Sequence, residues 1–210
     1  MDSNSGEHKP RSERIAAVIS FLTISPFQIV LYLAFAEIIC NTFAEAAILN
    51  TISGAFYLLI PFIPLLYVTR KKRSQDYSIP IRDRFLILLI QIFGFIGASV
   101  VYFYYPSWTG LDTGILFIFT VGYTILHVVC LIITSGGKFK ISLHMTGAAS
   151  SITGLVIVFG WWWAWLYLFC IPIGWSRVKL EAHSFSQVLW GTIVGGVTIF
   201  ITYVGFGYVF

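Results

Sequence analysis

The chain is a succession of long apolar segments separated by short polar stretches. Seven segments can be drawn, at residues 15–40, 44–68, 85–105, 113–134, 145–160, 161–174 and 188–210. A helix that crosses the hydrocarbon core of a bilayer needs about 20 apolar residues, and most of these segments have that length. Only 10% of the residues are charged, whereas a soluble domain carries about 25%. The sequence therefore predicts an all-α, polytopic transmembrane bundle of six to seven helices.

The same pattern predicts the domain organisation. Residues 1–14 form a polar N-terminal tail, and residues 15–210 form a single transmembrane domain with short loops. Ser25 and Pro26 interrupt the first segment, so its span is expected to begin near Phe27, after a short interfacial helix.

Two features of the later segments predict how the helices pack. The short segments at 145–160 and 161–174 predict a tight helical hairpin, which turns at the cluster Trp161–Trp163. Tryptophans of this kind are typical of the aromatic belt at a membrane surface. Gly191 and Gly195 form a GxxxG pattern in the last segment, which is predicted to allow close helix packing within the bundle.

The positive charges predict the orientation of the chain. All 13 Lys and Arg residues lie in four polar stretches, which are the N-terminal tail and residues 70–84, 138–144 and 176–187. If every segment crosses the bilayer, an even number of helices separates the last three stretches, so all four stretches share one face. The positive-inside rule places that face in the cytoplasm. We expect an integral protein of the cell membrane whose candidate site opens on the cytoplasmic side.

Residues 140–144 and 176–187 contain that candidate site. Histidines set among cationic side chains suit phosphoryl transfer through a histidine nucleophile. If the last helix begins near His183, Gln187 lies on the same helical face and accepts a hydrogen bond from one ring nitrogen of His183. The other nitrogen is then available to attack phosphorus, while His144 protonates the departing oxygen. The groups expected to hold the phosphate are nearby cations and a hydroxyl, namely Arg82, Arg84, Lys140, Arg177 and Ser142.

Other classes of site find little support in the sequence. Cys40, Cys130 and Cys170 all fall in apolar segments, and their odd number and spacing argue against a disulfide framework or a zinc site. No acidic cluster suited to magnesium accompanies the histidines, so we expect metal-independent chemistry without a cofactor. The expected partners are the lipid bilayer and a membrane lipid substrate, not nucleic acid. The oligomeric state is left open.

The motifs in residues 70–196 resemble those of the type 2 phosphatidic acid phosphatase superfamily of integral membrane lipid phosphatases. The third motif of that family is Ser-Arg, five residues, His, three residues, Asp. Ser176, Arg177 and His183 match it in position, and Gln187 replaces the aspartate. The match adds Ser176 to the residues expected near the phosphate. A neutral glutamine can orient the histidine but adds no charge to stabilise a protonated ring.

The other two motifs of the family match less fully. Its second motif, Pro-Ser-Gly-His, is represented by Ser142 and His144. Residues 76–84 look like the Asp-Ile-x-x-Arg variant of the first motif in a microbial branch of the family. That branch also carries Lys-x-Ser-x-His and His-x-x-x-Gln patterns, which correspond here to residues 140–144 and 183–187.

The resemblance implies a helical bundle that hydrolyses a lipid phosphate or diphosphate through a phosphohistidine intermediate. It implies His183 as the nucleophile and His144 as the acid. A site that faces the cytoplasm favours a biosynthetic substrate such as a prenyl diphosphate. Two alternatives remain open. The first is a phosphotransferase that passes the group to an alcohol, and the second is a transporter or non-catalytic lipid-binding protein of the same fold.

Overall fold

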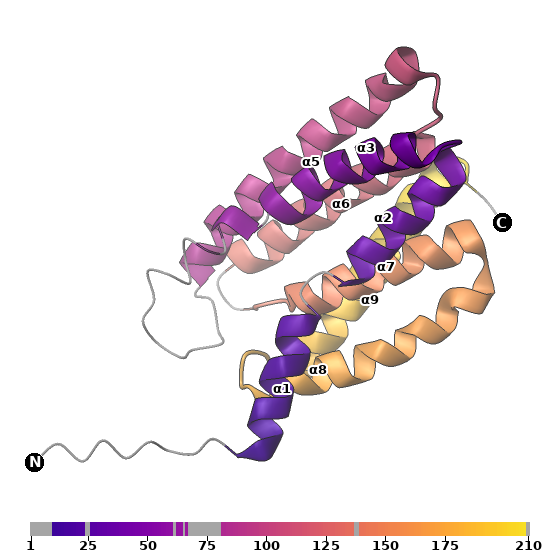
Figure 1. Ribbon diagram of the computed structural model, residues 1–210. Helices are drawn as coiled ribbons and strands as arrows, with labels where there is room; N and C mark the ends of the chain where they lie inside the picture. Colours follow the sequence, from indigo (N-terminus) through magenta and orange to yellow (C-terminus); the bar gives the residue numbers. More distant parts are fainter. Residues whose placement is uncertain are drawn as a thin grey trace, which may run out of the picture.

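Every regular element in the described part of the chain is helical. The computed structural model describes residues 10–23, 26–60, 62–64, 66, 81–136 and 139–208. The elements in chain order are α1 (Arg11–Leu22), α2 (Pro26–Ile39), α3 (Phe43–Gly54) with the π-helical turn η1 (Ala55–Leu59), α5 (Ile81–Thr109), α6 (Gly114–Ser135), α7 (Leu143–Phe159), the 3-10 helix η2 (Trp161–Phe169), α8 (Cys170–Lys179) and α9 (Phe185–Gly205) (Figure 1). This confirms the predicted all-α bundle.

The helices have the length and composition of membrane spans. Five helical stretches are long and apolar enough to cross a bilayer, namely Arg11–Ile39, Phe43–Pro64, Asp83–Thr109, Gly114–Ser135 and Phe185–Gly205. They coincide within a few residues with five of the predicted segments, and they make the chain an integral membrane protein. The first stretch consists of α1 and α2. Helix α1 begins at Arg11, inside the predicted tail, and α2 begins at Pro26, a position in the first turn where proline sacrifices no helical hydrogen bond.

The two short segments form the predicted hairpin. Helix α7 ends at Phe159, and η2 and α8 then run back along it. The turn lies at Gly160, one residue before the predicted tryptophan cluster. Gly160 has a φ of 96°, a conformation that is readily adopted only by glycine, so the chain turns at this residue. Trp161 and Trp162 are 71% and 90% exposed, as expected of side chains that face lipid or its interface.

The GxxxG pattern brings α9 against the beginning of α7. A Cβ atom added to Gly191 would lie 2.8 Å from the carbonyl oxygen of Ser142, and one added to Gly195 would lie 2.5 Å from that of Thr146. Glycine is therefore needed at both positions for the two backbones to approach this closely. The prediction that the pattern serves packing within the bundle is confirmed, and this contact fixes the position of the first turn of α7.

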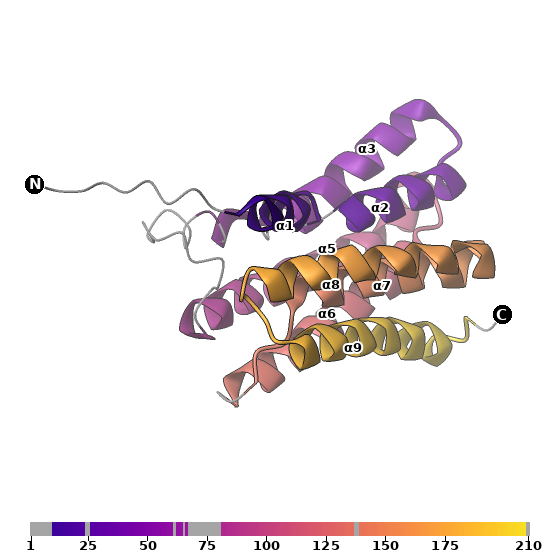
Figure 2. The ribbon, with the colours of Figure 1, turned by 90° about the horizontal axis from the view of Figure 1, so that it is seen from below.

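The helix ends that carry the described polar residues lie together at one end of the bundle. Figures 1 and 2 both place the beginnings of α5, α7 and α9 and the ends of α6 and α8 at this end. The turn at Gly160 and the end of α9 lie at the opposite end. Two helices separate Arg84 from His144, and two helical arms separate His144 from His183. The even spacing that was predicted therefore brings Arg84, His144 and His183 to the same end of the bundle.

Candidate active site

His183 is buried in the short loop between α8 and α9, and its partners define its tautomer. Its Nδ1 lies 3.0 Å from Oε1 of Gln187 and 3.0 Å from the carbonyl oxygen of Lys140. Its Nε2 lies 3.0 Å from Nη2 of Arg84. A carbonyl oxygen can only accept and a guanidinium can only donate. The proton of the neutral ring is therefore on Nδ1, and the lone pair is on Nε2, facing Arg84.

The predicted hydrogen bond between His183 and Gln187 is present. Helix α9 begins at Phe185, two residues after His183, with Ser184 as its N-cap. Ser184 and Gln187 form a capping box, in which the side chain of Gln187 turns back and accepts a hydrogen bond from the backbone N–H of Ser184 at 3.2 Å. The same oxygen is thereby held beside the ring of His183.

A tight turn connects His183 to Arg177. The backbone N–H groups of Ala182 and His183 both donate to the carbonyl oxygen of Arg177, at 3.1 and 3.2 Å. Glu181 within the turn has a φ of 53°, a conformation that is uncommon outside glycine. The turn explains why a spacing of six residues can place both side chains at one site.

Two arginine side chains are buried in the same region. Arg84 is 4% exposed and Arg177 is 5% exposed. Arg84 donates from Nη1 to the carbonyl oxygen of Ile141 at 2.8 Å, and Arg177 donates from Nη1 to Oγ of Ser20 at 2.5 Å. The two guanidinium groups are close enough for their charges to interact. Burying like charges together is unfavourable unless an anion joins them, so the region has the electrostatics of an anion site.

Three buried polar atoms at this site have no hydrogen-bond partner within the described residues. They are Nε of Arg84, Oγ of Ser142 and Nε2 of His144. Ser142 is the N-cap residue of α7, yet its hydroxyl makes no capping bond, and its backbone N–H donates to the carbonyl oxygen of Gln187. Buried polar groups are nearly always satisfied, so a cluster of unsatisfied ones indicates a place that receives a polar ligand.

The other residues that were predicted to bind phosphate differ in their positions and contacts. Lys140 contributes its backbone carbonyl to His183, and its charge acts on the same ring. The buried hydroxyl of Ser176 donates to the carbonyl of Ile173 in its own helix at 2.7 Å. Arg82 lies in the first turn of α5, and its side chain is outside the described residues.

Ser20 is a site residue that the sequence analysis missed. It lies on α1, it accepts the hydrogen bond from Arg177, and its backbone bonds to the ring of His144. A serine in the apolar part of a helix carries no signal of such a role.

The environment of His183 predicts a specific dependence of stability on pH. Burial, together with the positive charges of Arg84 and Arg177, lowers the pKa of His183 from 6.5 to about 3, against the opposing effect of Gln187. The unfolded chain binds a proton at this ring near pH 6.5, whereas the folded chain does not until about pH 3. The neutral ring therefore makes its full contribution to the unfolding free energy above pH 6.5, and this contribution is lost as the pH falls toward 3.

We expect the unfolding free energy of the wild type to fall more steeply between pH 7 and pH 4 than that of His183→Gln, which cannot titrate. Denaturant unfolding of both proteins in detergent, at several pH values, measures the difference. Parallel pH profiles would contradict a neutral, buried His183.

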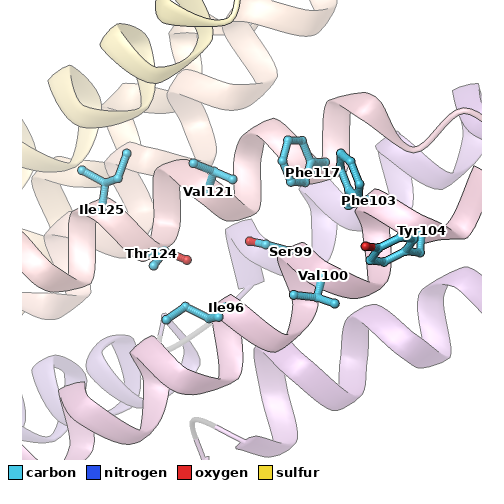
Figure 3. A pocket seen from close by; sticks show the side chains of 9 residues that line it. All are labelled: Ile96, Ser99, Val100, Phe103, Tyr104, Phe117, Val121, Thr124 and Ile125. Carbon is cyan, nitrogen blue, oxygen red and sulfur yellow. The ribbon is translucent and has the colours of Figure 1, made fainter.

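A groove between α5 and α6 lies away from this polar cluster. It has a volume of about 410 Å³, and Figure 3 shows Ile96, Phe103 and Phe117 along its walls. Ile96 is 12 residues beyond Arg84, which is roughly 18 Å along the helix axis. The hydroxyls of Ser99 and Thr124 within it both donate to carbonyls of their own helices. The groove therefore offers hydrocarbon contacts, and the candidate for chemistry is the polar cluster.

Comparison of the chain with protein family models, with curated proteins and with solved structures found no match. The site is therefore interpreted from its own geometry.

Proposed function

We propose that the chain is a metal-independent membrane lipid phosphatase of the type 2 phosphatidic acid phosphatase kind, acting on a lipid phosphate or diphosphate of the prenyl diphosphate or phosphatidate type. The observation that carries the proposal is the set of buried polar atoms without a hydrogen-bond partner in the part of the chain that the structure describes, Nε of Arg84, Oγ of Ser142 and Nε2 of His144, on residues of the same site as His183. Two of these atoms can donate to phosphate oxygens, and the third can exchange a proton with a leaving oxygen.

The charges of the site support a phosphoryl ligand over an uncharged one. Arg84 and Arg177 are buried, and the positive charge of Lys140 acts on the same ring. Guanidinium groups bind phosphate oxygens with paired, charge-assisted hydrogen bonds. In the described part of the chain no group of three or more His, Cys, Asp or Glu side chains can hold a metal ion, so in this proposal the arginines neutralise the charge of the phosphoryl group.

In the proposed reaction Nη2 of Arg84 moves its hydrogen bond from Nε2 of His183 to a phosphoryl oxygen, and Nε2 attacks phosphorus with the lone pair that this releases. The bond between phosphorus and the lipid oxygen breaks, and His144, protonated at Nε2 when the anionic substrate is bound, donates that proton to the departing oxygen. Water then attacks the phosphohistidine, His144 takes its proton, and inorganic phosphate leaves. The carbonyl of Lys140 and the amide of Gln187 both hold the Nδ1 proton, so the orientation of His183 does not depend on Gln187 alone.

The orientation of the bundle completes the proposal. The site lies at the end of the bundle that bears Arg11, Lys140 and Lys179, and the positive-inside rule assigns that end to the cytoplasm. A lipid whose head group lies in the inner leaflet would reach the site by lateral diffusion. This side favours a substrate made in the cytoplasm, such as a prenyl diphosphate.

Phosphate release by detergent-purified protein in excess chelator tests the proposal. The substrate panel contains prenyl diphosphates, prenyl phosphates and phosphatidate, and His183→Ala is measured beside the wild type. We expect release from at least one lipid, inhibition by vanadate and a loss of at least about 1000-fold in the variant. Release that persists in His183→Ala would contradict the mechanism. Lipid binding without release would favour the transferase or the lipid-binding alternative.

A further inference from the structure

Helix α1 carries a buried polar residue, Ser20, on the face that packs against the bundle. Its outer face is apolar and exposed, with Val18 57% and Phe21 72% accessible, as expected of a helix that faces lipid. Its inner face packs against α8 beside the candidate site (Figure 1). On that inner face Ala16 is fully buried and Ser20 is 6% exposed. A buried hydroxyl on the apolar part of the helix requires a polar partner.

Ser20 contacts two residues of the site, Arg177 on α8 and His144 on α7. Its Oγ lies 2.5 Å from Nη1 of Arg177, and because a guanidinium only donates, the hydroxyl accepts. The ring of His144 also hydrogen-bonds to the backbone of Ser20. Nε2 of His144 has no partner among the described residues, so this bond runs from Nδ1–H to the carbonyl of Ser20.

The two histidines are thus held in the same way. A backbone carbonyl accepts from Nδ1 in each case, that of Lys140 for His183 and that of Ser20 for His144. Nε2 of His144 then remains for proton transfer, whereas Nε2 of His183 accepts from Arg84 until a ligand takes over that hydrogen bond. The carbonyl of Ser20 fixes the tautomer of His144, and its hydroxyl fixes the end of the Arg177 side chain.

We propose that Ser20 is a positioning residue of the phosphate site and that α1 completes this site by holding Arg177 and His144 in place. The inference rests on the proposed function. Arg177 has a long, flexible side chain, and fixing its guanidinium before the ligand arrives removes part of the entropic cost of binding. The exposed apolar residues of α1 keep the helix at the lipid boundary, where its inner face can hold Arg177 and His144. Arg177 contacts the phosphoryl group before and during the reaction, so the effect of Ser20 falls on binding.

The test compares Ser20→Ala, Ser20→Thr and Val18→Ala, the last being a control on the exposed face of the same helix. For each protein, KM, kcat and the dissociation constant of vanadate are measured, together with thermal unfolding. We expect Ser20→Ala to raise KM and the vanadate constant roughly ten-fold, which corresponds to the loss of one hydrogen bond to a charged group, while kcat changes by less than about two-fold. Ser20→Thr retains the hydroxyl and is expected to restore both constants.

The outcomes separate the two proposals. If the wild type hydrolyses lipid phosphate and binds vanadate, and Ser20→Ala behaves as Val18→Ala does, Ser20 has no positioning role and only this inference fails. If Ser20→Thr is as impaired as Ser20→Ala, the role is one of packing and the inference also fails. If the wild type neither releases phosphate nor binds vanadate, the proposed function fails and this inference fails with it.

Discussion

Replacing Arg84 with methionine is expected to reduce phosphate release by at least about 100-fold, the usual loss when one donor to a developing anionic charge is removed. The same change is expected to alter stability little, because removal of the buried charge offsets the loss of the hydrogen bonds to Ile141 and His183. Arg84 is 4% exposed, its Nε is unsatisfied, and the charge of Arg177 lies nearby. A buried charge of this kind is unfavourable without its ligand, and an apolar side chain of similar length removes that penalty.

Thermal unfolding in phosphate-free detergent buffer, with and without vanadate, measures both halves of this expectation. Vanadate should raise the unfolding temperature of the wild type, because a ligand that binds only the folded state stabilises it, and should leave Arg84→Met unchanged. Arg11→Met is the matched control, since Arg11 is exposed at the beginning of α1. If Arg84→Met is strongly destabilised and still responds to vanadate, Arg84 is a structural residue and the site lies elsewhere.

The architecture could be predicted from the sequence because it depends on the spacing of apolar segments. A stretch of about 20 apolar residues has few alternatives to a membrane helix, and five such stretches form the helical spans. The close packing of the last helix was likewise predictable, because Gly191 and Gly195 lie one helical turn apart, but its partner helix was not. The exact turn at Gly160 was missed by one residue, because the more conspicuous tryptophans beside it do not determine the backbone conformation.

The parts of the site that side chains form could be predicted from the sequence, whereas the parts that backbone groups form could not. His183 and Gln187 were paired from their spacing, but the capping box of Ser184 and Gln187 was the better signal and would have placed the helix start correctly. The acceptors from Lys140 and Ser20 are backbone carbonyls, which no residue type encodes. The hydroxyl of Ser176 bonds within its own helix, an outcome that depends on a rotamer and not on the motif.

The second large effect is expected at Gly195, where an added methyl group would meet the backbone of Thr146. In Gly195→Ala the new Cβ would lie 2.5 Å from the carbonyl oxygen of Thr146, 2.9 Å from its Cα and 3.1 Å from its carbonyl carbon. Because no flexible side chain can yield, α9 must move away from α7. We expect a loss of about 1–3 kcal/mol in unfolding free energy, as for overpacked cores.

The same displacement is expected to impair the site. Gln187, which holds the ring of His183, lies in the first turn of α9, whereas Ser142 and His144 lie at the beginning of α7, and the backbone bond from Ser142 to Gln187 is 3.2 Å long. A shift of about 1 Å between these helices can reduce the reaction rate roughly 100-fold. Gly205→Ala is the matched control in the same helix, because nothing lies within 4 Å of its added Cβ. Its stability should change by less than about 0.5 kcal/mol. If the two variants unfold alike and release phosphate alike, the α7–α9 contact does not hold the site together.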